Sequence, residues 1–279
     1  MVKKVVVVAF AIFIAVSGIF AQTVVYYDPD GNIKRIFDIN AQGNKVFGAI
    51  GIKFIAAADE KSFRAAMDLK PDFVIINSLV YLRERESFSL EPIGILVRKG
   101  KYVYQKKIVS FLYSDLDSLS GKVISSSLEE AVYTIGGGIK FRLLKVPKDL
   151  DALLAVKFRQ ADSAMVSEDS LEIFKAIDPT SFQNLKFVFS TKGIYNPVVC
   201  ITRWGNEKDK GKVLNVLSTA KELLTVMGFD SVSDDEKILS KLRWGGWYEK
   251  IYFISINSFW HIYFGVCSKF WRFSEVFFP

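Results

Sequence analysis

Residues 70–81 read KPDFVIINSLVY, and this stretch contains the unit from which the fold is built. Pro71 ends a preceding helix, because proline cannot continue the hydrogen-bond ladder of a helix interior. The run from Asp72 to Ile76 is short and almost wholly apolar, which is typical of a buried strand. Short polar side chains follow, and these can accept hydrogen bonds from a first helical turn. A helix is therefore predicted from Leu79.

The same alternation of apolar runs and amphipathic stretches extends from Thr23 to about Arg243. It predicts an α/β fold with a mostly parallel sheet, because parallel strands are joined by helical crossovers. Strands are predicted over residues 24–27, 52–55, 72–76, 107–113, 122–124, 141–146, 163–166, 185–189 and 198–201. Helices are predicted over residues 59–69, 149–160, 167–177 and 208–227, and after residues 78 and 127.

Three of these helices have features that can be checked in a structure. Ser127 and Glu130 have the spacing of a capping box, in which each side chain bonds the other residue's backbone N–H. Gly228 is placed to end the last helix as a C′ glycine. The helix over residues 149–160 is predicted to bury one apolar face. That face consists of Leu150, Leu153, Leu154 and Phe158.

Composition argues against several functional classes. The formal net charge is +7, but lysine and arginine form no run of the kind that marks a nucleic-acid-binding patch. Cys200 and Cys267 have neither metal-ligand nor disulfide spacing. The single histidine, His261, lies near the C-terminus, away from the predicted α/β body. Gly136–Gly138 lacks the Lys-Ser/Thr that follows a phosphate-binding loop. We therefore expect a protein that is not an enzyme and has no cofactor, metal or nucleic-acid partner.

The N-terminus has the pattern of a secretory signal peptide. Lys3 and Lys4 precede an apolar stretch from Val5, and a small residue, Ala21, stands at the predicted cleavage site. We expect residues 1–21 to be removed and the protein to be periplasmic or extracellular. An uncleaved membrane anchor is the alternative, because a span needs about 20 apolar residues and the uncharged run is nearly that long.

Residues 244–279 differ in kind from the rest of the chain. They are rich in Phe, Trp and Tyr, and Ile251–Cys267 contains no Asp, Glu, Lys or Arg. The segment follows neither helical nor strand periodicity. Three interpretations stay open: an interfacial or membrane segment, a partner-binding tail, or sequence foreign to the fold.

Four stretches, taken in order, resemble a known family. The chain resembles the type II periplasmic solute-binding proteins of ABC importers, in the branch that serves phosphate- and phosphonate-type solutes. The resemblance covers about residues 23–228. It is carried by KPDFVIINSLVY at 70–81, LSGKVI at 119–124, AVKFRQADSAMV at 155–166 and YNPVV at 195–199.

The resemblance implies a two-lobed fold in which mixed sheets are flanked by helices and a ligand cleft lies between the lobes. Lobe one would comprise residues 23–107 plus 202–243, and lobe two residues 108–201. The two crossing segments would form a hinge. It also implies a small-molecule ligand, an ABC permease in the membrane as partner, and a monomer.

Candidate ligand-binding residues are those at helix starts and at the end of the first strand. First-turn N–H groups and the helix dipole attract anions and acceptor atoms, and the resemblance implies that several such starts converge on the cleft. The candidates are Tyr26, Tyr27, Asn77, Ser78, Ser125, Ser126, Ser127, Ser167 and Glu168. Plain helix capping by the serines, and core packing by the tyrosines, are the alternatives for each of them.

Two departures from the family leave the ligand open. Ser125–Leu128 stands where the branch has a Ser-Thr-Ser-Gly turn, and Asn77–Val80 stands where it has Ser-Pro-Leu-Ala. Glu129 and Glu130 already place negative charge at one helix start, where the helix dipole favours it. A neutral or zwitterionic ligand is therefore also an option. The sequence predicts capture of a small polar solute, with an oxyanion or phosphonate as one option. A sensing module of the same fold, acting on a membrane receptor, is the alternative function.

We predict that the mature protein begins at or near Gln22, because Ala21 is the small residue that follows the apolar stretch. N-terminal sequencing of protein recovered from the host's extracytoplasmic fraction checks this. Protein that is soluble in the cytoplasm and retains Met1 would contradict both export and the transport role.

Overall fold

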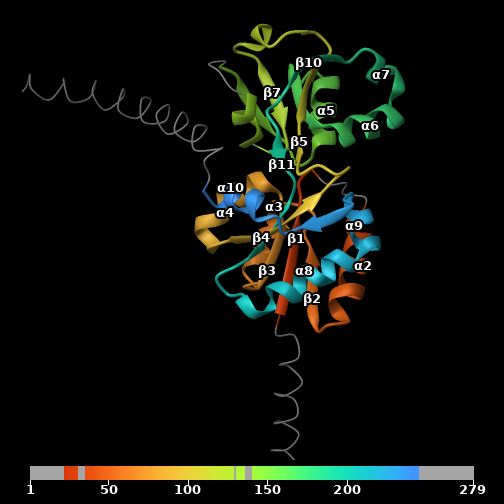
Figure 1. Ribbon diagram of the computed structural model, residues 1–279. Coiled ribbons are helices and arrows are strands. Elements are labelled where there is room, and N and C mark those ends of the chain that lie inside the picture. Colours follow the sequence, from red (N-terminus) through yellow and green to blue (C-terminus); the bar gives the residue numbers. More distant parts are fainter. Residues whose placement is uncertain (1–21, 31–34, 129, 136–139, 245–279) are drawn as a thin grey trace, which may run out of the picture. The chain divides into compact units, whose positions relative to one another are not determined.

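The computed structural model describes residues 22–30, 35–128, 130–135 and 140–244 (Figure 1). The chain divides into two units, Met1–Leu239 and Ser240–Pro279, and of the second unit only residues 240–244 are described. The predicted signal peptide and nearly all of the aromatic segment therefore lie outside the described residues. Within the described ranges, no helix is long and apolar enough to cross a membrane.

The first sheet has six strands in the order β13-β4-β12-β3-β1-β2. β1 runs parallel to β2 and β3, whereas β12 is antiparallel to β3 and β4, and β13 is antiparallel to β4. The bounds are β1 Gln22–Tyr27, β2 Ile52–Ala56, β3 Phe73–Ile76, β4 Glu91–Val97, β12 Val198–Ile201 and β13 Ser231–Ser233.

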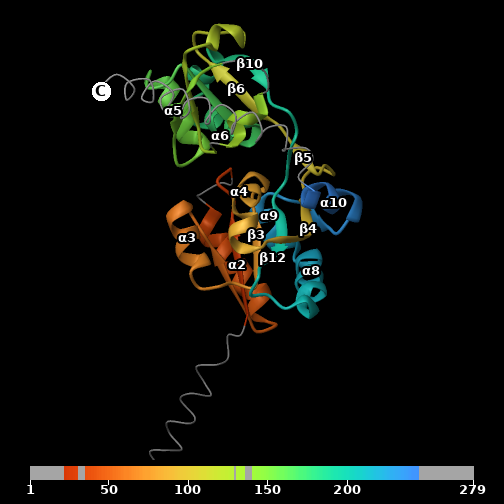
Figure 2. The same cartoon turned by 90° about the vertical axis from the view of Figure 1, so that its left-hand side faces the viewer.

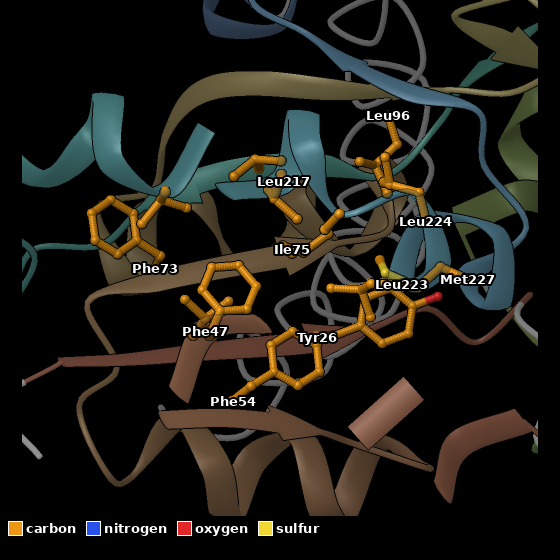
Figure 3. Close-up of a cluster of buried hydrophobic side chains, with 14 of the residues drawn as sticks. Tyr26, Phe47, Phe54, Phe73, Ile75, Leu96, Leu217, Leu223, Leu224 and Met227 are labelled. Atoms are coloured by element: carbon orange, nitrogen blue, oxygen red, sulfur yellow. The ribbon is translucent and has the colours of Figure 1, made fainter. Parts of the chain in front are cut away.

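Helices cover this sheet on both faces, with α2 and α9 on one side and α3 and α4 on the other (Figure 1). α2 (Ile36–Gly48), α8 (Lys210–Thr219) and α9 (Lys221–Met227) pack their apolar side chains onto the sheet, and Figure 3 shows part of this core. α3 (Glu60–Met67) and α4 (Ser78–Phe88) lie on the opposite face. Adjacent residues of a strand point to opposite faces. Tyr26 therefore joins the α2–α9 core, and Tyr27 stacks on Phe63 of α3 at 4.8 Å between ring centroids.

The second sheet has five strands in the order β10-β6-β9-β7-β8. β7 is parallel to β8 and β9, while β6 is antiparallel to β9 and β10. α5 (Asp149–Lys157) and α6 (Glu168–Ile177), labelled in Figure 2, supply the apolar side chains that pack on it. α7 (Pro179–Gln183) follows (Figure 1). The strand bounds are β6 Lys106–Ser110, β7 Val123–Ser126, β8 Arg142–Lys145, β9 Ser163–Ser167 and β10 Lys186–Ser190.

The chain crosses twice between the two sheets. β5 (Val103–Tyr104) lies in the first crossing and β11 (Ile194–Tyr195) in the second, and the two pair antiparallel. Short 3-10 turns complete the described chain at Asp117–Leu119, Glu130–Ile135 and Glu207–Asp209, and α10 spans Glu236–Trp244. The predicted α/β fold with mixed sheets flanked by helices is confirmed, but the expectation of mostly parallel pairing is wrong, because β12, β13, β6 and β10 pair antiparallel. The sequence assigns 198–201 to lobe two, whereas β12 pairs within the six-stranded sheet. The stated lobe boundaries stay a prediction.

Two predicted helices differ from the observed ones. The helix expected over 208–227 is interrupted at Ala220, whose ψ of 59° is not helical, and so forms α8 and α9. Phe158 was expected to be buried but is 65% exposed, because α5 ends at Lys157 and helical periodicity does not extend past it. The buried side chains of α5 include Ala152, Leu153, Ala155 and Val156. Gly228 ends α9 in the left-handed conformation, with φ of 88°, as predicted.

The packing of α2 on β2 gives a test of this fold. A Cβ added at Gly43 would overlap the ring of Phe54, which is fully buried and stacked on Phe47. Gly43→Ala should therefore lower the free energy of unfolding by about 1–3 kcal/mol, the usual cost of overpacking a core.

Gly48→Ala is the matched control in the same helix, because nothing lies within 4 Å of its added Cβ. It should be neutral or should stabilise by up to about 1 kcal/mol through helix propensity. Denaturant unfolding of both variants is the measurement. Equal stabilities would contradict the packing of Phe54 beneath α2.

Candidate functional site

The centre of the site is a lysine with no exposure to solvent. Lys106 is the first residue of β6, and its Nζ lies 2.7 Å from Asp30 Oδ1 and 2.8 Å from Asp149 Oδ1. Asp30 follows β1 in a turn, and Asp149 is the first residue of α5. A buried ammonium is tolerated when carboxylates and hydrogen bonds replace its hydration shell. Lys106 thus links the turn after β1, in the six-stranded sheet, to the start of α5, which packs on the five-stranded sheet.

Ser127 and Asp149 extend this contact through the five-stranded sheet. The Ser127 hydroxyl donates to Asp149 Oδ1 at 2.5 Å and lies 3.3 Å from Asp30 Oδ1. The other carboxylate oxygen, Asp149 Oδ2, accepts from the backbone N–H of Ser167 at 2.7 Å. The carboxylate therefore holds the end of β9 and the turn after β7 against the start of α5.

The second carboxylate oxygen of Asp30 accepts a hydrogen bond from the first crossing, and Asn77, after β3, extends the contacts from there. Tyr104 of β5 donates its hydroxyl to Asp30 Oδ2 at 2.6 Å. Asn77 Nδ2 lies 3.3 Å from the Tyr104 hydroxyl and 3.0 Å from Asp28 Oδ1. We call the connected set the Lys106 network. Its members are Asp28, Asp30, Asn77, Tyr104, Lys106, Ser127 and Asp149.

Electrostatics keep the central lysine charged. Burial by itself would lower the pKa of Lys106, but the charges of Asp149 and Asp30 outweigh burial and raise that pKa above its ordinary value. Burial, followed by the neighbouring charge of Asp30, raises the pKa of Asp28. The network therefore places one ammonium among three carboxyl groups.

A pocket of about 410 Å³ adjoins the network through Asp30 and Asp149. Its wall takes residues from the turn after β1, from α2 and α9, and from the starts of α5 and α6. Charges of both signs line it together with an apolar surface. The charged residues are Asp30, Arg35, Arg98, Lys99, Lys148, Asp149, Asp169, Glu172 and Asp230. The apolar ones are Pro29, Ile39, Leu150, Ile173, Val226 and Met227.

Arg98 stabilises another part of the wall. Its Nη1 lies 2.7 Å from Asp169 Oδ2 at the start of α6, and its Nε donates to the carbonyl of Gly228 at 3.1 Å. The guanidinium also lies over the ring of Phe229, 4.6 Å from its centroid. Arg98, which directly follows β4, therefore contacts both the start of α6 and the end of α9.

The predicted tyrosines are buried away from the pocket. Tyr26 is 2% exposed inside the α2–α9 core, and among the described residues its hydroxyl has no hydrogen-bond partner. Tyr27 is 5% exposed and packs on α3. Neither is among the residues that line the pocket. A ligand-contacting role for them stays a prediction.

Most predicted serine hydroxyls have acceptors within the protein. Ser125 Oγ lies 2.9 Å and 3.0 Å from the carbonyl oxygens of Ala152 and Ser163, which share its one proton, and Ser126 Oγ donates to the carbonyl of Leu128. Ser78 Oγ donates to the carbonyl of Tyr195 in the second crossing. These contacts follow the rule that buried hydroxyls find partners.

Of the remaining candidates, Asn77 and Ser167 cap helices, and Ser167 and Glu168 line a second pocket of about 280 Å³. Asn77 accepts from the N–H of Leu79, which confirms the predicted cap, and it also belongs to the Lys106 network. Ser167 caps α6 by accepting from the N–H of Ser170. The side chain of Glu168 is 69% exposed and lies 3.3 Å from Lys107 Nζ.

The helix expected after Ser127 is replaced by a shorter element, and the predicted capping box with Glu130 involves a side chain outside the described ones. Ser125 and Ser126 belong to β7, and the structure after Ser127 is a 3-10 turn from Glu130 to Ile135. The Ser127 hydroxyl donates to the buried carboxylate of Asp149. Local spacing alone could not reveal this partner, which is 22 residues away.

Sequence reasoning missed the charged centre of the site. Residues 28–30 have the composition of a turn, and Asp149 is the kind of acid often found in a first helical turn. Lys106 stands just before a predicted strand. None of these patterns identifies a buried charge. Within the described ranges, no group of three or more His, Cys, Asp or Glu side chains could hold a metal ion.

Neither a family model nor a curated protein sequence matches the chain, but solved structures do. The Xanthomonas citri protein XAC2383, solved with chloride, superimposes with a TM-score of 0.63 at 12% identity, over 82% of this chain and 98% of its own, and its structure with ATP has a TM-score of 0.62. A binding protein component of an ABC phosphonate transporter from Pseudomonas aeruginosa has a TM-score of 0.61 at 15% identity, over 80% and 85%.

PhnD1 from Prochlorococcus marinus, solved with methylphosphonate, has a TM-score of 0.59 at 15% identity, over 82% of this chain and 98% of its own. These similarities show that the chain has the two-lobed α/β fold of periplasmic binding proteins. At this level of identity they show the fold and not the ligand.

The Lys106 network predicts an unequal effect of two adjacent lysines on stability. Lys106→Met leaves Asp30 and Asp149 buried without their counter-charge, so the free energy of unfolding should fall by about 3–5 kcal/mol. Lys107→Met is the matched control, since Lys107 makes a partly exposed pair with Glu168 that is worth about 1 kcal/mol or less. Denaturant unfolding at neutral pH measures both, and similar losses would contradict the network's structural role.

Proposed function

We propose that the protein is an extracytoplasmic solute-binding protein, which captures a small polar solute in the pocket beside the Lys106 network. The observation that carries this proposal is the composition of the pocket wall. Ile39 and Met227 come from helices on the six-stranded sheet, and Leu150 and Ile173 from helices on the five-stranded sheet. A ligand in the pocket touches elements of both sheets, so binding favours the arrangement in which both contribute.

The pairing of charges around the pocket also supports binding. Lys106 is matched by Asp30 and Asp149, and Arg98 by Asp169. Groups held in such pairs serve to shape and preorganise a site. The comparison structures that share this fold include one solved with methylphosphonate and one with ATP. Fold analogy adds weight to a binding role and does not by itself choose the ligand.

The ligand is expected to differ from a doubly charged oxyanion. Ser125, Ser126 and Ser127, the candidates for holding phosphonate oxygens, donate their hydroxyls to acceptors of the protein itself. The carboxylates along the pocket would repel a dianion. A solute of low net charge with polar and apolar parts fits this lining better.

Export and delivery complete the proposal. The signal-peptide pattern at residues 1–21 directs the chain across the cytoplasmic membrane, where a monomer would hand its solute to an ABC permease. In the alternative role the same fold would report its ligand to a membrane receptor. Loss of solute uptake when the gene for this protein is deleted distinguishes transport from sensing.

Blocking the pocket tests the proposal directly. Native mass spectrometry of mature protein purified from its host should reveal a retained small molecule. At a concentration 100 times its Kd, that molecule should stabilise the protein by about 2.7 kcal/mol. Ile173→Trp should abolish this shift, because the indole would project into the pocket that Ile173 lines and occupy space the ligand needs.

Ile177→Trp is the control four residues along α6, at a position that is 57% exposed and outside the pocket lining. It should keep the ligand-induced shift. A ligand that stabilises both variants equally would place binding elsewhere. If nothing is retained, and a broad set of small metabolites gives no shift, the solute-binding function itself would be wrong.

A further inference from the structure

One half-buried cation of the pocket, Lys148, has within the described part of the chain no contacting counter-charge of the kind that Lys106 and Arg98 have. Lys148 precedes α5 at its N-cap position, is half-buried, and lines the pocket. Among the described residues it makes no ion pair within 4 Å and no side-chain hydrogen bond. By contrast, Lys106 contacts two carboxylates and Arg98 contacts Asp169.

The surroundings of Lys148 make this isolation costly. Burial lowers the pKa of Lys148, and the more distant charges of Asp28, Asp30 and Asp149 only partly oppose that effect. The ammonium is thus partly dehydrated without a contacting anion to replace the lost water. An anionic group placed in the pocket would supply that contact.

The rest of the lining specifies what the anionic group is attached to. Next to Lys148 in the sequence, Leu150 faces the pocket, and Ile39, Ile173, Val226 and Met227 complete an apolar surface. A pocket of about 410 Å³ lies within the usual range of about 300–1,000 Å³ for small-molecule sites. This surface suits a hydrocarbon body of several carbon atoms.

The number of charges on the ligand is limited by the acidic residues of the wall. Asp30, Asp149, Asp169, Glu172 and Asp230 all line the pocket. A single negative charge is balanced by Lys148, whereas a second one would face these carboxylates without a further half-buried, unpaired cation among the described residues. Of the other basic residues of the lining, Arg98 is paired with Asp169, and Arg35 and Lys99 are exposed.

We propose that the pocket binds a small monocarboxylate with an apolar body, and that Lys148 is the residue that receives its carboxylate. This inference rests on the proposed solute-binding function and names the class of solute. A phosphate or phosphonate dianion is disfavoured by the same residues.

A matched set of probes tests the class. Linear and branched carboxylates of four to eight carbon atoms are compared with their amides and with alkylphosphonates of similar length, by calorimetry on the mature full chain. At least one carboxylate should bind, and its amide should bind at least about tenfold more weakly. The alkylphosphonate of similar length should bind no more tightly than that carboxylate.

Substitutions test the residue. Lys148→Met should weaken carboxylate binding by at least about tenfold and leave amide binding unchanged, while Lys148→Arg keeps most of the affinity. Lys53→Met is the control, because Lys53 is exposed on the edge strand β2 and is absent from the pocket lining. Thermal unfolding confirms that each variant is folded, as expected for a side chain that makes no capping hydrogen bond.

The outcomes separate this inference from the function beneath it. Tighter binding of the amide or the phosphonate, or equal affinities for Lys148→Met and the wild type, would overturn the carboxylate assignment. If another solute is bound and Ile173→Trp abolishes its binding, the solute-binding function stands and only the class is wrong. If Ile173→Trp changes the binding of no solute, both the carboxylate assignment and solute binding in this pocket are wrong.

Discussion

The buried ammonium of Lys106 is the interaction on which the arrangement of the site depends. Its Nζ requires Asp30 and Asp149 within hydrogen-bond distance, and these residues are 76 and 43 positions away in the chain. Removing an ion from water costs several kcal/mol, so a pair separated without solvent would be strongly unfavourable. Water must therefore enter whenever the turn after β1 moves away from α5. The network thus ties the position of that turn to the exclusion of water from Lys106.

Much of the fold could be predicted because it is encoded locally. Apolar runs such as Phe73–Ile76 and caps such as Asn77 depend on neighbours within a few residues. The short strands β5 and β11 could not be predicted, since two residues have no periodicity and pair only through tertiary structure. The break at Ala220 and the exposure of Phe158 also fall at helix ends, where periodicity no longer decides burial.

The site was less predictable than the fold, for a related physical reason. A serine at a helix start can face a ligand, cap the helix or satisfy a distant acceptor, and the sequence does not choose among these. Ser125 bonds carbonyls 27 and 38 residues away, so its hydroxyl is committed by strand packing. Lys106 resembles any lysine that begins a strand until the fold buries it. Its role follows from desolvation, which is a property of the folded chain.

The basic residues around the pocket differ in whether their charge is already paired with a carboxylate of the protein. Lys106 and Arg98 each neutralise carboxylates of the wall, and their positive charge is therefore used in holding elements together. Lys148 has no such structural task among the described residues, because α5 begins without a hydrogen bond from its side chain. A charge that stabilises no contact of its own, yet lines a cavity beside Leu150 and the rest of an apolar surface, remains available to a bound molecule. The same electrostatic cost that forces Lys106 into an internal pair thus makes Lys148 the position where an external anion gains the most.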